Sequence, residues 1–363
     1  MKRTAAIVAA LAGISSAYPA MEELMSHLSK RQTSTELIGD LATLQDGQLT
    51  QTGRDVKSIL QGSASGLDAT STAGTVPAKG SPECVQDTCC IWTYIALDMR
   101  NAMVDPDGQC NDVSRQSVRL GFHDAFGWSK SSGSAGGADG SIILAGECES
   151  RTGNQGLSDI CSRLRTWFNQ YQQFGISMAD LVQMAANVGT VSCPLGPRVR
   201  SFVGRKDSNQ PSPRDDIPSS SGTADELISQ FAERTFTPNN LAALLGAHST
   251  GRQTTVDPAR AGAAFDSTPG VWDTEFYGQV LDPKAPSQVF KMQSDINLSQ
   301  DPRTKQAWNA FVGTQGQGVW DGEYATAYVR MSLLGVENIN DLTECTKVLP
   351  PFIASFNGTQ PTA

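Results

Sequence analysis

The chain has 363 residues, of which 39% are hydrophobic, and carries a formal net charge of −9 at pH 7 with a pI of about 4.9. A chain of this length can bury one large core or two medium ones. Its acidic balance argues against nucleic acid or an anionic membrane surface as a partner. No stretch is apolar for long enough to span a bilayer.

The N-terminal residues are typical of export. Lys2 and Arg3 precede a short apolar run, and small residues near position 17 offer a cleavage site. We therefore predict a signal peptide over 1–17 and a secreted, extracellular protein. The dibasic pair Lys30–Arg31 indicates the end of a propeptide over 18–31.

Residues 32–81 are rich in Ser, Thr, Gly, Ala and Gln. This composition is typical of a linker that cannot bury enough surface to become ordered. Within it, the sequence allows one short helix near 55–61. From Cys84 onward, apolar residues recur at helical spacing, and the one short strand candidate is 200–203. We predict an all-α domain with little β structure over 82–356, followed by a polar tail over 357–363.

Helices are expected in chain order at 90–104, 118–126, 157–174, 177–188, 225–234, 241–248, 302–312 and 321–334. Ser177 and Asp180 have the spacing of a capping box at the start of the 177–188 helix. Thr237 and Pro238 are typical of a helix start before the apolar residues that lead to His248.

The first of two histidine-containing segments holds a polar pair within apolar flanks. Arg119 and His123 stand four residues apart, so on a helix they project from one face, whereas Asp124 points about a quarter turn away. A surface helix with an ordinary polar pair is the alternative interpretation. The apolar neighbours favour a pair that looks into the protein interior.

The second histidine of this region, His248, ends an apolar helix. A buried, hydrogen-bonded core residue is its ordinary explanation. The chain has only three histidines, however, and both of these are followed directly by a small oxygen-bearing residue, Asp124 and Ser249. This parallel favours a shared site.

An oxygen-rich loop follows each histidine. The first set is Asp124, Gly137, Asp139 and Ser141, and the second is Ser249, Asp266, Thr268, Val271 and Asp273. Carboxylates, hydroxyls and loop carbonyls are the hard ligands that Ca²⁺ prefers, although neither loop is an EF-hand and each alone is explained by an ordinary polar turn. If one histidine binds a metal, its other ring nitrogen needs an acceptor, and Asp295 is a candidate. Asn154 is a candidate for orienting His123 in the same way.

All eight cysteines lie between Cys84 and Cys345. An even number in an exported chain favours disulfides over metal ligation, and about 105 pairings are open from the sequence alone. Asn297 and Asn357 begin N-glycosylation sequons.

Taken together, these motifs resemble the secreted fungal haem peroxidases, class II of the plant–fungal–bacterial peroxidase superfamily. The resemblance covers about 84–351, in order and at similar spacings. It rests on Arg119-Leu120-x-Phe122-His123-Asp124, Gly137-Ala138-Asp139-Gly140-Ser141, Gly204-Arg205-Lys206-Asp207, Ala247-His248-Ser249 and Phe265-Asp266-Ser267-Thr268-Pro269-Gly270.

The resemblance implies haem b between a distal half, about 82–230, and a proximal half, about 231–356. His248 would bind the haem iron and hydrogen-bond to Asp295. His123 would move a proton of H₂O₂, with Asn154 holding its tautomer, while Arg119 stabilises developing charge. Phe122 would pack over the haem.

The two oxygen-rich sets would each bind one Ca²⁺. The resemblance also implies the disulfides Cys84–Cys90, Cys89–Cys345 and Cys110–Cys193. Cys148 and Cys161 have no counterpart in the family and are left to pair with each other. The family's cross-link in the C-terminal region is absent.

Departures from the family concern the reducing substrate. The positions that match the Mn²⁺ ligands of manganese peroxidases are Asp112, Gln116 and Thr254, so two of three acids are missing. The position of the surface tryptophan of lignin and versatile peroxidases is Ala243.

We therefore expect an extracellular, monomeric peroxidase that uses H₂O₂ to oxidise phenolic or other small aromatic donors in one-electron steps. Two alternatives remain open. One is a calcium-bound secreted binding protein of the same fold without turnover, and the other is a peroxidase with a surface tryptophan radical for bulky substrates.

Overall fold

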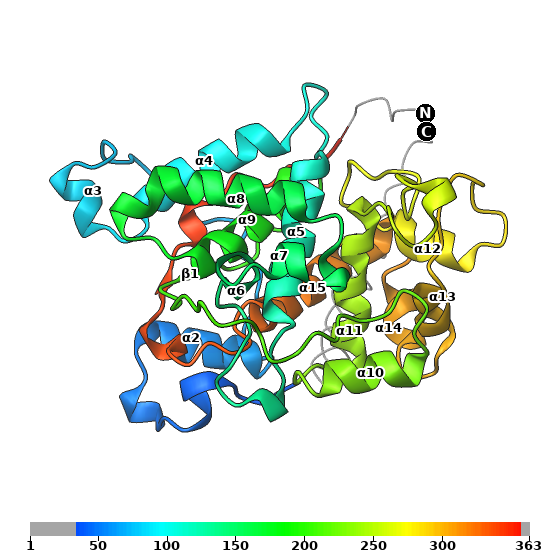
Figure 1. Cartoon of the computed structure of the whole chain (residues 1–363), viewed down its shortest axis with the longest axis horizontal. Helices are drawn as coiled ribbons and strands as arrows, with labels where there is room; N and C mark the ends of the chain where they lie inside the picture. Colours follow the sequence, from blue (N-terminus) through cyan, green and yellow to red (C-terminus); the bar gives the residue numbers. More distant parts are fainter. Residues whose placement is uncertain (1–33, 357–363) are drawn as a thin grey trace, which may run out of the picture.

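The computed structural model describes residues 34–356 (Figure 1). The predicted signal peptide, the propeptide and the polar tail with Asn357 lie outside these residues. As expected, the described chain is mainly helical. Its α-helices are α2 (Gln51–Leu60), α3 (Pro82–Gln86), α4 (Cys90–Met103), α5 (Asp112–Ala125), α6 (Ser141–Leu144), α7 (Glu147–Ser150), α8 (Ser158–Tyr171), α9 (Met178–Ser192), α10 (Ala224–Ala232), α11 (Pro238–Leu245), α12 (Glu275–Leu281), α13 (Gln293–Gln300), α14 (Lys305–Ala310) and α15 (Gln317–Met331).

Helix α9 lies at the centre of one side of the molecule, where it packs against α4, α5 and α8 (Figure 1). All of its residues are buried, including the polar side chains of Asp180, Gln183 and Asn187. Ser177 accepts a hydrogen bond from the Asp180 amide at 3.0 Å. The predicted capping box also requires the Asp180 carboxylate to accept from the Ser177 amide, and this part of the prediction is wrong. The carboxylate instead accepts from the backbone of Gly204 and the guanidinium of Arg205.

Helix α11 packs against α14 and α15 on the other side of the molecule (Figure 1). Thr237 caps it and Pro238 is its first residue, as predicted. The helix ends at Leu245, earlier than expected, and His248 lies in the 3₁₀ turn η6 (Gly246–Thr250). A tighter final turn of this kind satisfies carbonyls at a helix end, and the Gly251 amide here donates to His248 O at 2.7 Å.

The linker prediction for residues 32–81 is wrong for 34–60. This segment forms two 3₁₀ turns and α2, and Leu41, Val56 and Ile59 are at most 1% exposed. Its carbonyls accept hydrogen bonds from Arg330 on α15, which donates to Ser34 O, Glu36 O and Leu60 O. Few apolar residues suffice here because the rest of the domain supplies the surface that they cover.

The predicted strand shortens to β1 (Phe202–Val203), which pairs antiparallel with β2 (Thr343–Glu344). All four expected disulfides form: Cys84–Cys90, Cys89–Cys345, Cys110–Cys193 and Cys148–Cys161. Within residues 34–356, no helix has the length and apolar character needed to cross a membrane.

Candidate active site

Helix α5 carries both Arg119 and His123, one turn apart. Asn111 starts the helix by accepting from the Val113 amide at 3.0 Å. His123 is 7% exposed, and its Nδ1 lies 2.8 Å from Asn154 Oδ1. Because Asn154 Nδ2 donates to Glu147 O at 2.9 Å, the Asn154 oxygen faces the ring and the proton belongs on Nδ1. The Nε2 of His123 is therefore the nitrogen that is free to accept a proton.

Burial, and then the positive charge of Arg119, lower the pKa of His123 to about 3, although the bond to Asn154 opposes this shift. The imidazole is thus neutral over the whole range from mildly acidic to neutral pH. A neutral, oriented histidine with one free nitrogen has the state that a general base requires.

Arg119 is held by two backbone carbonyls of the segment that also holds Asn154. It donates to Gln155 O at 2.8 Å and to Gly153 O at 3.2 Å. The side chain keeps solvent-accessible surface, yet the protein atoms around it lower its pKa to about 10 through lost hydration. It remains positively charged at neutral pH and contributes a fixed cation beside His123.

The His248 ring lies against a carboxylate, that of Asp295, which is the pairing that the family resemblance implies. Its Nδ1 lies 3.3 Å from Oδ2 of Asp295, a fully buried residue of α13, and its ring packs edge-on against Phe276. The side chain is 30% exposed, and its Nε2 has no hydrogen-bond partner among residues 34–356. An acceptor on one ring nitrogen and a free second nitrogen are the features of a histidine that binds a metal.

Phe122, the predicted haem neighbour, belongs to an aromatic cluster at the end of α5. Its ring lies edge-on to His123 at 5.4 Å and contacts Phe126 at 4.9 Å, measured between ring centroids. Phe231 of α10 stacks on it from the other half of the chain.

The structure brings the first predicted calcium set together. The two oxygens of Asp124 accept from the amides of Gly140 and Ile142, and Asp139 accepts from the Ser141 amide at 2.9 Å. Burial, and then the charge of Asp139, raise the pKa of Asp124 well above its usual range. A buried carboxylate with a second, partly buried carboxylate close to it fits a site for a cation.

The second predicted set is also clustered. Thr268 donates to Asp273 at 3.0 Å and to Asp266 through its amide at 2.8 Å, while Ser249 Oγ bonds to Val271 O at 3.2 Å. Asp266 Oδ2 is buried without a partner, and burial raises the pKa of Asp273 to about 6. Each set holds only two carboxylates, and within residues 34–356 no three His, Cys, Asp or Glu side chains form a metal-binding group. Any cation would therefore also need the hydroxyl and carbonyl oxygens of the set.

Sequence reasoning missed Arg115, which joins α5 to the neighbourhood of the second oxygen-rich set. It donates to Thr250 O at 2.8 Å and to Pro269 O at 3.0 Å, next to the second set, from its place one turn before Arg119. It also pairs with Asp112, the one acid retained from the Mn²⁺ ligand positions. Asp112 and Arg115 are three residues apart, and on a helix this spacing predicts such an ion pair.

Comparison with known proteins decides the family. A family model described as peroxidase matches residues 96–314. The chain belongs to the peroxidase family. It is 32% identical over 304 residues to a peroxidase of Arthromyces ramosus, covering 78% of this chain and 81% of that protein.

This peroxidase is also similar to two proteins whose names indicate other donors. It is 31% identical to manganese peroxidase 3 of Phlebia radiata, over 72% of this chain and 77% of the relative. It is 30% identical to ligninase C of Trametes versicolor, over 80% of this chain and 82% of the relative.

Membership of the family makes this chain an oxidoreductase and implies haem. The donor set of His248 fits that cofactor, because imidazole is a ligand of haem iron and the Asp295 carboxylate fixes the orientation of the ring. The alternative of a binding protein without turnover is accordingly set aside. All six tryptophans lie within residues 34–356, and none is more than 9% exposed. The surface-radical alternative therefore lacks an exposed tryptophan to use.

Proposed function

We propose that this peroxidase is secreted as a monomer and uses H₂O₂ to oxidise phenolic or other small aromatic donors. One H₂O₂ accepts two electrons and two protons to give two molecules of water, and two donor molecules each lose one electron. The single observation that carries the proposal is the pair His123 and His248. Each ring has one nitrogen held by a side chain, and the other has no hydrogen-bond partner among residues 34–356.

In this proposal His248 and Asp295 hold haem b, between the half over 82–230 and the half over 231–356, with Phe122 packed against it. When bound, haem would supply the iron that is oxidised by the peroxide and that then oxidises the donor. His123 Nε2 removes a proton from the peroxide and returns it to the departing oxygen. Arg119 stabilises the negative charge that develops as the O–O bond breaks.

Asn154 keeps the proton of His123 on Nδ1, which leaves Nε2 ready to act. Its carbonyl oxygen can only accept, because its amide nitrogen is committed to Glu147 O. An imidazole held in the other tautomer would present a proton where a base is needed.

We further propose that the two oxygen-rich sets bind Ca²⁺. The ligands would be Asp124, Gly137, Asp139 and Ser141 for the first ion, and Ser249, Asp266, Thr268, Val271 and Asp273 for the second. Within the described part of the chain none of their four carboxylates pairs with a cationic side chain, and each set includes the residue directly after a histidine. Loss of either ion should therefore disturb that histidine.

Manganese is not expected as the donor. Gln116 and Thr254 replace two acids, and Asp112 is committed to Arg115. Ala243, which stands at the position of the surface tryptophan, is fully buried. A panel of a phenol, Mn²⁺ and a non-phenolic aromatic, each assayed with H₂O₂, tests this specificity; oxidation of Mn²⁺ as fast as the phenol would refute it.

The proposed roles are tested by replacing His123 and Asn154 with alanine. We expect the rate constant for H₂O₂ to fall about 10²–10⁴-fold for His123→Ala, as for a lost general acid–base group, and about 10–100-fold for Asn154→Ala, as for a lost orienting partner. The exposed Asn169 offers a matched control, and Asn169→Ala should react like the wild type. Unchanged kinetics in His123→Ala would refute the assignment.

A further inference from the structure

Three consecutive residues supply the hydrogen-bond partners that the Arg119 and His123 side chains have among residues 34–356. Gly153 and Gln155 supply the two carbonyls that hold Arg119, and Asn154 supplies the oxygen that faces His123. These residues lie in the segment 148–161, which the disulfide Cys148–Cys161 closes into a loop. We propose that the Cys148–Cys161 disulfide positions both Arg119 and His123 for reaction with peroxide. This inference rests on the proposed roles of these two residues.

The position of the disulfide at the two ends of the loop explains why it should position Arg119 and His123. Both cysteines are buried, Cys148 in the short helix α7 and Cys161 in α8, so the disulfide joins two helices packed in the core. Between them the chain makes only a 3₁₀ turn (Thr152–Asn154) and a reversal at Gly156, whose φ is +84°. Backbone hydrogen bonds within the loop reach over no more than four residues, as from Cys161 N to Leu157 O. The disulfide is therefore the covalent link between the two ends of the loop, beside a solvent-exposed ion pair of Arg165 on α8 with Glu149 on α7 at 2.8 Å.

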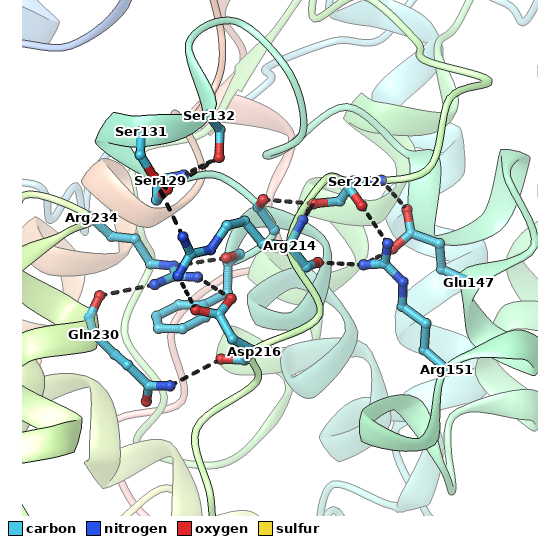
Figure 2. A network of polar contacts seen from close by, with 12 residues as sticks. Ser129, Ser131, Ser132, Glu147, Arg151, Ser212, Arg214, Asp216, Gln230 and Arg234 are labelled. Carbon is cyan, nitrogen blue, oxygen red and sulfur yellow. Dashed lines mark hydrogen bonds and ion pairs between the residues drawn. The ribbon is translucent and has the colours of Figure 1, made fainter.

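The outer side of the loop is fastened by a second, non-covalent attachment. Arg151 pairs with Glu147 at 2.6 Å and donates to Ser212 O and Arg214 O, as Figure 2 shows. Glu147 Oε1 in turn accepts from the Ser212 amide at 2.8 Å. The loop is thus held between the segment 212–214 on the outside and the disulfide at its ends, with its three site-facing residues directed towards α5.

Cys84–Cys90 and Cys89–Cys345 do not have this relation to the site. Cys84–Cys90 encloses no residue that contacts Arg119 or His123, and Cys89–Cys345 joins positions far apart in the chain. Cys84–Cys90 closes a short loop between α3 and α4, so it is the matched control for the loss of a local cross-link. The family resemblance provides no counterpart of Cys148–Cys161, which makes the device a property of this chain.

Small displacements at this position have large kinetic effects. A reacting group displaced by about 1 Å can slow a reaction about 10²-fold. Both residues act on the peroxide, whereas oxidation of the donor needs neither of them in this scheme. Loss of the disulfide should therefore slow the peroxide step and leave the donor step largely unchanged.

The test compares Cys148→Ala/Cys161→Ala with Cys84→Ala/Cys90→Ala in the full haem-loaded chain. We expect the rate constant for H₂O₂, and the rate of cyanide binding to the ferric protein, to fall about 10–100-fold in the first variant only. The rate constant for a phenolic donor should stay within about threefold of wild type in both. Hydrogen exchange of the Asn154, Gln155 and Leu157 amides should become at least tenfold faster in the first variant, a readout independent of activity.

Equal H₂O₂ and cyanide rates in the two variants would overturn the proposal. So would a parallel loss of the peroxide and donor steps, which would indicate general destabilisation. If Cys148→Ala/Cys161→Ala does not fold, the measurement is repeated with Cys148→Ala/Cys161→Val, which restores buried volume. If neither variant binds haem, the disulfide serves folding, and the proposal is also overturned. His123→Ala in the same series separates the hypotheses, because its failure to slow the peroxide step would refute the proposed function itself.

Discussion

Replacing Ile59 with alanine tests whether the N-terminal segment is part of the folded domain. Ile59 lies in α2, is fully buried and belongs to the same apolar cluster as residues of α11 and α15. The substitution removes three buried carbon atoms and leaves a cavity, which costs about 2–5 kcal/mol for a buried isoleucine. Arg330 anchors both ends of this segment through backbone carbonyls, so the site has little freedom to collapse.

The assay is urea or thermal unfolding of the holoprotein. For a domain of this size the expected loss corresponds to a lower Tm by about 3–7 °C. Val85→Ala is the control, because Val85 is 73% exposed and its truncation should change stability by less than about 0.5 kcal/mol. If Ile59→Ala unfolded at the same temperature as Val85→Ala, the packing of this segment on the domain would be refuted.

Three further predictions follow from the buried charges. Asp180→Asn leaves the Arg205 guanidinium buried without its carboxylate and should cost about 3–5 kcal/mol; an unchanged urea midpoint would contradict this. Chelation of Ca²⁺ at neutral pH should lower both the Tm and the rate of reaction with peroxide, and Asp266→Asn should reproduce part of this loss. A chelator that changed neither quantity would refute the calcium sites. The pKa of His123 is lowered to about 3, so its base form persists until the pH falls through that value. Arg119→Leu removes a positive charge that lowers this pKa, so the acid limb of the pH profile of the peroxide rate should move to higher pH. An acid limb that stayed in place or moved to lower pH would contradict this prediction.

The parts of the fold that were predictable from the sequence depend on local interactions. Thr237 and Pro238 start α11 because capping needs only a side chain and the next amides. The spacing of Arg119 and His123 placed them on one face because helical geometry fixes it. The oxygen-rich sets were readable because their members cluster within short loops that begin beside a histidine.

The features that were missed depend on contacts between distant parts of the chain. The composition of 34–60 conceals the few apolar residues that the rest of the domain buries. Asp180 lies at the expected start of α9, but a buried guanidinium at Arg205 competes for its carboxylate more strongly than the helix terminus does. Arg115 joins α5 to residues more than 130 positions away, and no local pattern encodes such a contact.

The most direct test of the account is the visible absorption spectrum before and after a stoichiometric addition of H₂O₂, for the wild type, His248→Ala and His123→Ala. The wild type should show a Soret band that changes rapidly with peroxide. His248→Ala should lose the band or bind haem weakly, whereas His123→Ala should keep the band and respond slowly. A wild-type spectrum without a Soret band, or a His248→Ala variant that binds haem and reacts like the wild type, would contradict the claim that these two histidines serve one haem.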